Sequence, residues 1–153
     1  MDFTKEKYII VELIPTSSKK ETGDIIQLSA LKLDGITLLD RFDYRLEDQY
    51  IESKDLKEMI QYDKKSFNYV KDSNMILRKF QKWAKDYPLF IIEENYTRDY
   101  LRELDNKKEC IFPHLELENS QNVFEKLIQK YHLEPSNHLV DLIYEAIIFK
   151  SNE

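Results

Sequence analysis

The chain has 153 residues, of which 42% are hydrophobic and 34% charged, and this composition is typical of a folded globular protein rather than a disordered one. A domain of this length buries roughly 68–70% of its unfolded surface, so one hydrophobic core suffices without metals or disulfides. The formal net charge of −6 is opposite in sign to that of a protein holding nucleic acid mainly through phosphates. Composition therefore predicts one domain over residues 1–153 and argues against tight nucleic-acid binding.

The compartment is inferred from cysteine usage and from the apolar segments. Cys110 is the only cysteine, so no intrachain disulfide forms, and its apolar neighbours favour a buried, inert thiol. The N-terminal residues lack the layout of a signal peptide, and no apolar run approaches the ~18 residues that cross a bilayer. We therefore expect a cytoplasmic protein without membrane contact.

The first half of the chain predicts three strands. Residues 8–14 form an almost continuous apolar run, as expected of a central strand covered on both faces. Residues 25–33 and 36–44 are joined by Asp34-Gly35, a dipeptide that supplies the positive φ angles of a two-residue turn. The two segments are therefore predicted to pair as an antiparallel hairpin.

A helix, a strand and a second helix are predicted next. Residues 72–87 carry apolar side chains at helical spacing, with Asp72 or Ser73 available as the N-cap and Pro88 just past the end. Residues 89–92 are apolar and short, as in a buried strand, and residues 95–104 form a second helix. The first of these helices is expected to cover one face of the sheet.

The last third predicts a short strand and two helices. The apolar run at 110–112 is followed by a helical stripe over 120–131 and by an apolar helix over 137–150. A helix that is apolar nearly all round is either deeply buried or covered by a partner. The order of elements predicts an α/β fold with a mixed sheet of about five strands and helices on both faces.

With its elements in this order, the chain resembles the DEDDh group of 3′-to-5′ exonucleases, which includes the epsilon proofreading subunit of bacterial DNA polymerase III, on the ribonuclease H-like fold. The resemblance spans Tyr8–Thr16, Asp24–Gly35, Phe80–Asn95 and His138–Phe149. It implies four carboxylates that hold two magnesium or manganese ions, and a histidine that takes a proton from the attacking water. The two metals would polarise the scissile phosphate and stabilise the leaving oxygen.

The first motif departs from this pattern. Glu12 stands where the family has its first Asp, and Ile14 stands where it has Glu. Positions two apart on a strand share one face, so both side chains would reach the metal pair. Glu12 can still coordinate, whereas Ile14 cannot. Thr16 matches the family's threonine and is a predicted binding residue.

The second motif keeps two of its polar residues. Asn95 and Asp99 match the family's Asn and Asp, while Glu94 and Arg98 occupy the positions of His and Phe. The resemblance implies a metal ligand at Asp99 and a binding role for Asn95. The alternative for Asp99 is an exposed acid in the first turns of a helix, where the helix dipole favours it.

The third motif has two registers. Aligning His138 with the family's histidine places Ile143 at the last Asp, whereas aligning Glu145 with that Asp places Val140 at the histidine. One register retains a vestigial general base, and the other retains a carboxylate. Neither supplies both groups, so a metal ligand is lost at Ile14 and, in the first register, also at Ile143.

These losses predict a catalytically degenerate exonuclease-like protein that acts as a binding or regulatory module. Glu12, Asp99 and Glu145 would hold at most one weakly bound Mg²⁺ or Mn²⁺, and no cofactor is required. The bound group would be a protein partner, through the apolar helix 137–150, or a nucleic-acid end held weakly. The alternative is an active 3′-to-5′ exonuclease that uses substitute carboxylates such as Asp141 or Glu93.

A basic rim around the cleft would favour nucleic acid. Three lysine pairs are candidates for it, although paired surface lysines are mostly just solvated: Lys19 with Lys20, Lys64 with Lys65, and Lys107 with Lys108.

Overall fold

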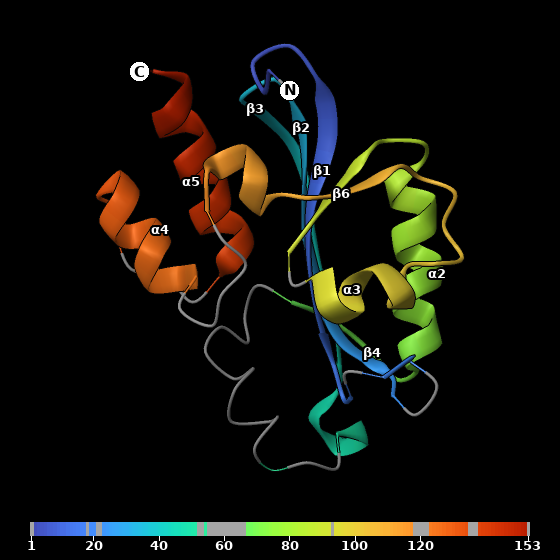
Figure 1. Cartoon of the computed structure of the whole chain (residues 1–153). Helices are drawn as coiled ribbons and strands as arrows, with labels where there is room; N and C mark the ends of the chain where they lie inside the picture. Colours follow the sequence, from blue (N-terminus) through green and yellow to red (C-terminus); the bar gives the residue numbers. More distant parts are fainter. Residues whose placement is uncertain are drawn as a thin grey trace.

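A six-stranded mixed sheet forms the centre of the protein, with helices on both of its faces (Figure 1). The strand order is β4-β3-β2-β1-β5-β6. The structure is a computed structural model, and it describes residues 2–17, 19–20, 23–51, 54, 67–92, 94–117, 123–134 and 138–152. The strands are β1 (Lys7–Pro15), β2 (Ile25–Asp34), β3 (Thr37–Leu46), β4 (Asn68–Val70), β5 (Leu89–Ile91) and β6 (Lys108–Cys110).

β1 lies inside the sheet because its apolar side chains can be buried on both faces. It pairs antiparallel with β2 and parallel with β5. Val11 packs in the core on one face, and Ile10 packs in the core on the other. β2 and β3 form the predicted hairpin, and Gly35 adopts a φ of +61° in its turn. An added Cβ at Gly35 would lie 2.7 Å from the carbonyl oxygen of Thr4, so both the turn and the space require glycine.

Two helices pack against one face of the sheet. They are α2 (Ser73–Ala84) and α3 (Glu94–Tyr100), which lie together on one side of the strands in Figure 1. Asp72 caps α2 by accepting a hydrogen bond from the Asn74 N–H at 2.9 Å. Ile76 and Phe80 of α2 are fully buried against the sheet.

The other face is covered by the C-terminal third of the chain. Helices α4 (Val123–Tyr131) and α5 (Leu139–Ser151) lie there, next to the 3₁₀ helix η4 (Phe112–Leu115). Another 3₁₀ helix, η2 (Asp48–Tyr50), follows β3. The six core residues of α5 are buried against the sheet and α4: Leu139, Val140, Leu142, Ile143, Ala146 and Ile147.

The predicted fold class is confirmed, with one difference in the strand count. The sequence predicts about five strands, and the sixth is β4, which has three residues and only one of them buried. So short a segment carries no period that distinguishes it from a loop. The apolar helix expected at 137–150 is buried within the chain, and Phe149 is its one large apolar side chain that the structure describes as exposed, at 46%.

Within the described ranges, no helix combines the length and the apolar content that a bilayer crossing requires.

Candidate functional site

A row of polar side chains crosses three strands on the face of the sheet that α5 covers. The strand register places Glu12, Ser29 and Asp43 directly opposite one another. Ser29 and Asp43 are buried, and Glu12 is partly buried. Side chains alternate between the faces of a sheet, and the residues beside this row pack toward α2. Burying a polar group costs free energy unless the group is hydrogen-bonded, so hydrophobic packing does not account for the side chains of this row.

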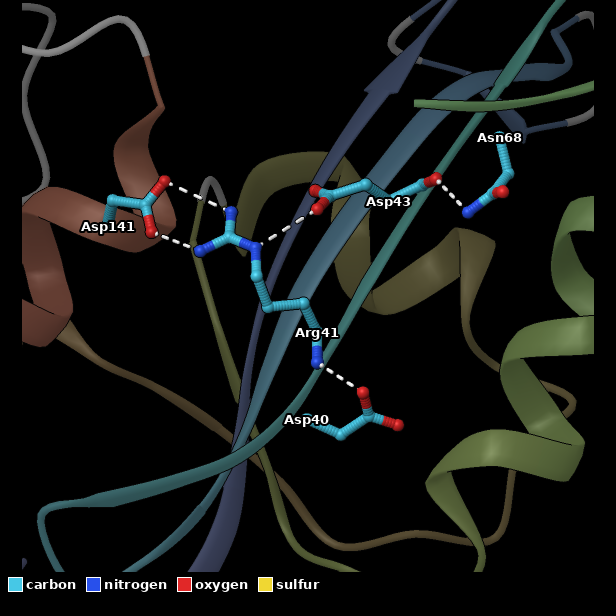
Figure 2. A network of polar contacts seen from close by, with 5 residues as sticks. All are labelled: Asp40, Arg41, Asp43, Asn68 and Asp141. Atoms are coloured by element: carbon cyan, nitrogen blue, oxygen red, sulfur yellow. Dashed lines mark hydrogen bonds and ion pairs between the residues drawn. The ribbon is translucent and has the colours of Figure 1, made fainter. Parts of the chain in front are cut away.

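Arg41 connects this row to α5 (Figure 2). Its guanidinium donates two hydrogen bonds to Asp141, at 2.6 Å and 3.2 Å, and its Nε donates to Oδ2 of Asp43 at 3.2 Å. Asp43 Oδ1 is buried and accepts no hydrogen bond from any residue that the structure describes. The side chain of Asn68 donates to the main-chain oxygen of Asp43 at 3.3 Å. We refer to Arg41, Asp43 and Asp141 as the arginine clamp.

The arginine clamp holds two carboxylates around one permanent cation. Asp141 lies in the first turn of α5, where the helix dipole also favours a negative charge. Hydrogen bonding to Asp141 and the charges of both carboxylates raise the pKa of Arg41 above its ordinary value, against the opposing effect of burial. The guanidinium therefore stays charged, and its planar fork suits a bidentate contact with a carboxylate.

A buried cation lies two residues beyond Asp43 on β3. Arg45 is fully buried, donates its Nε to the oxygen of Leu46 at 3.3 Å and forms an ion pair with Asp48. Its guanidinium also lies over the ring of Tyr69, 5.2 Å from the centroid. In the strand register Arg45 is opposite Gln27, which is buried as well. Polar side chains therefore occupy two successive rows of the sheet, which we call the polar strip: Glu12, Ser29 and Asp43 in one row, and Gln27 and Arg45 in the next.

The residues expected to hold a metal are found in three different surroundings. Glu12 lies in the polar row of β1. Asp99 is exposed and lines a surface pocket of about 380 Å³ with Arg98, Arg102, Asn106 and Lys108. Glu145 is exposed on α5, and its pKa is raised by partial desolvation and by the nearby charges of Asp141 and Glu134. Among the described residues, no three His, Cys, Asp or Glu side chains form a group that could hold a metal ion.

The two isoleucines in the family's acid positions contribute to packing. Ile14 lies opposite Gln27 and packs against the core on the α2 side. Ile143 is fully buried in the core between the sheet and α5. Apolar side chains there stabilise the fold by roughly 1.5–3 kcal/mol each when fully buried. Neither position can supply a ligand.

Three further residues were predicted as a base or as binding residues: His138, Thr16 and Asn95. His138 is the N-cap residue of α5 and makes no capping hydrogen bond with its side chain, and its ring stacks on Phe67 at 5.9 Å between centroids. Thr16 closes the loop after β1, since its Oγ1 accepts a hydrogen bond from the Asp24 N–H at 2.9 Å. Asn95 lies in α3, but its side chain falls outside the described part, as does all of Glu93.

Sequence reasoning missed the arginine clamp and the polar strip. The signal was present as a period of two: Arg41, Asp43 and Arg45 alternate along β3, while Gln27 and Ser29 do so along β2. On paired strands such alternation places all five side chains on one face. Asp141 gave no comparable signal, because a single acid near a helix N-terminus is common on any surface.

The sheet order, the β2–β3 hairpin beside a central β1 and the helices on both faces define a ribonuclease H-like α/β protein. The polar strip lies between this sheet and the last helix.

Solved structures of exonuclease I share this fold. Its product-bound structure matches 95% of this chain with a TM-score of 0.59 and 9% sequence identity. A complex of exonuclease I with the inhibitor BCBP matches 96% of the chain with a TM-score of 0.59 and 10% identity, and the ExoI/SSB-Ct complex matches 96% with 0.55 and 12%. The chain spans only 40–42% of the length of these structures. At such identities the likeness establishes the fold alone.

No protein-family model matches the chain, and no curated protein matches it significantly.

Proposed function

We propose that this protein is a binding or regulatory module built on an exonuclease fold, without useful phosphodiester hydrolysis. One observation carries the proposal: the guanidinium of Arg41 bonds the carboxylates of both Asp43 and Asp141 on the α5 face of the sheet. These acids are the substitutes best placed to serve a metal-dependent reaction, and both already neutralise a fixed cation.

The chemistry of divalent ions supports this reasoning. Mg²⁺ requires near-octahedral oxygen coordination and binds mainly through carboxylates and waters. An ion that approached Asp43 would meet the positive charge of Arg41 at short range, in a setting where the low dielectric strengthens repulsion. Ile14 adds no donor in the adjacent row. Any ion is therefore expected to bind weakly and singly, whether at Glu12, Asp99 or Glu145.

The competing function is a metal-dependent 3′-to-5′ exonuclease with substitute carboxylates. It gains support from the orientation of Asp141, which comes from the last helix and points to Arg41 on the sheet (Figure 2). If substrate or metal displaced Arg41, Asp43 and Asp141 would become available together. The two functions therefore differ in whether the arginine clamp opens.

A digestion assay with labelled single-stranded DNA and RNA in Mg²⁺ or Mn²⁺ separates the two functions. We expect no metal-dependent release of nucleotides by the wild-type protein. Turnover that is lost in Glu12→Gln, Asp141→Asn or Asp99→Ala, but is retained in Asp34→Asn, would overturn the proposal in favour of the exonuclease. Asp34 is a suitable control because it is an exposed acid at the end of β2.

A further inference from the structure

The exposed face of α2 carries a stripe of positive charge on an acidic protein. Residues 71–86 contain two acids, Asp72 and Asp86, whereas the whole chain has a net charge of −6. Asp72 is engaged as the N-cap of α2. The five basic side chains of this segment are all exposed, and we call them the α2 stripe: Lys71, Arg78, Lys79, Lys82 and Lys85.

None of the five cations of the α2 stripe forms an ion pair with a residue that the structure describes. By contrast, Lys20 pairs with Glu103 at 3.8 Å and Lys107 pairs with Glu109 at 3.7 Å. The ammonium of Lys108 donates to two main-chain oxygens. The lysines that the sequence suggested as a basic rim are thus largely engaged where they are described, and the open charge lies on α2.

The spacing of the α2 stripe suits a linear polyanion. Arg78 and Lys82 are four residues apart, which places them on one side of α2 about 6 Å apart along its axis, and Lys85 follows as the C-cap residue. A surface depression of about 610 Å³ lies along the same side and is lined by Met75, Arg78, Lys79, Gln81 and Lys82. Charge at this interval can follow the phosphates of an extended strand.

Further positive charge lies at the C-terminal end of α2. Lys32 reaches from β2 to the main-chain oxygen of Trp83, and its ammonium lies 4.5 Å from the centroid of the Trp83 ring. Desolvation and the charge of Lys85 lower the pKa of Lys32, and the charge of Asp40 opposes this effect.

We propose that the α2 stripe binds the phosphate backbone of single-stranded nucleic acid, without reading its sequence. A protein interface is usually centred on buried aromatic or aliphatic anchors. The large apolar side chains that the structure describes as exposed all lie off α2: Ile36, Leu39, Tyr50, Tyr69 and Phe149. Dense charge with few apolar anchors is the pattern expected of phosphate contacts, which supply affinity but no sequence information.

The α2 stripe lies across the sheet from the arginine clamp, since α2 and α5 cover opposite faces (Figure 1). The inference therefore goes beyond the proposed function and holds whether or not the α5 face hydrolyses phosphodiesters. Binding measured in EDTA and compared between variants of the α2 stripe and control variants tests the α2 stripe. Digestion measured in Mn²⁺ tests the arginine clamp alone.

The experiment is a fluorescence anisotropy titration of fluorescein-labelled dT15 and rU15 with the intact protein in EDTA. Three to five phosphate contacts predict that log K falls with log salt with a slope of about −2 to −3.5. The charge-reversed variant Arg78→Glu/Lys82→Glu should lose at least tenfold in affinity, with a shallower slope. The control Lys5→Glu/Lys126→Glu has the same net charge, changes an N-terminal side chain and one on α4, and should bind within about twofold of wild type.

Two further variants keep the test independent of folding. Arg78→Lys/Lys82→Arg preserves charge and should preserve binding, whereas Arg78→Gln/Lys82→Gln should lose it in part, with unchanged far-UV circular dichroism in both. Equal losses in the stripe and control variants would overturn the proposal. So would a salt slope near zero, or competition by poly-glutamate as strong as that by unlabelled dT15, which would assign the stripe to an acidic peptide.

Discussion

Replacing Arg41 by methionine should destabilise the protein because it leaves a buried carboxylate without its cation. The side chain of Asp43 is 7% exposed, that of Asp141 is 28% exposed, and that of Arg41 is 39% exposed. Breaking a fully buried ion pair costs about 3–5 kcal/mol, whereas an exposed pair contributes about 0.2–1 kcal/mol. Since Arg41 is partly solvated, we expect Arg41→Met to lower the free energy of unfolding by about 2 kcal/mol.

The effects of substituting Arg41 and Asp43 should not add. Asp43→Asn keeps the shape of the side chain and removes the stranded charge, so Arg41→Met/Asp43→Asn should be less destabilised than the sum of its single variants by about 1 kcal/mol. Urea unfolding followed by circular dichroism at 222 nm would measure the cycle. Arg78→Met is the matched control, because Arg78 is exposed and unpaired among the described residues, and it should change stability by less than about 0.5 kcal/mol.

Two results would refute this account of the arginine clamp. One is an Arg41→Met variant no less stable than Arg78→Met, which would mean that water or another polar group stabilises the Asp43 carboxylate in place of Arg41. The other is strict additivity in the cycle, which would mean that Arg41 and Asp43 contribute separately. In thermal unfolding, the expected loss corresponds to a fall in Tm of about 4–8 °C for a chain of this size.

Three other substitutions test the fold. Tyr8 is fully buried, its hydroxyl donates to the oxygen of Gly35 at 3.0 Å, and burial raises its pKa, so its contribution to stability should be present below pH ~10 and fall as pH rises above it. Tyr8→Phe should cost about 1 kcal/mol at pH 7 and show a smaller alkaline loss in urea unfolding, whereas an unchanged alkaline loss would contradict the assignment. Two lysines, one on α4 and one on α5, lower the pKa of Glu116. The contribution of Glu116 to stability is therefore present above its ordinary pKa and disappears as pH falls through the lowered value. Glu116→Gln should flatten the acid limb of a Tm–pH profile, and an unaltered limb would count against the ion pairs. Lys85 ends α2 with a φ of +54°, where glycine is less strained, so Lys85→Gly should raise stability by about 1 kcal/mol in urea unfolding, and a loss of stability would show that the strain is not there.

The scaffold was predictable because each of its main elements has a local signal. The apolar run of β1, the β2–β3 hairpin and the Asp72 cap of α2 depend on contacts within a few residues, and all three occur. The two-residue turn of the hairpin is Gly35-Ile36, one position later than the predicted Asp34-Gly35, because Asp34 still pairs with Thr37 in the sheet. β4 was missed because its three residues owe their strand conformation to pairing with Tyr44–Leu46 rather than to their own pattern. Strand propensity is decided largely by such neighbours.

The candidate site was predictable only in part. The resemblance identified Glu12, and the structure places it in the polar row on the α5 face. It also pointed to Asp99 and Glu145, which the structure places on separate exposed surfaces. Arg41 and Asp43 lie in β3, outside the segments that carry the resemblance.

The sequence by itself determined the strands, the hairpin and the amphipathic helices, because hydrophobic periodicity and capping are properties of neighbouring residues. Only the tertiary structure decided that Arg41 of β3 meets Asp141 of α5, a residue 100 positions further along the chain. It also decided that the cations of α2 stay exposed while Arg45 is fully buried. The pairing of charges depends on how helices dock on a sheet, and docking is set by the whole core rather than by any local pattern.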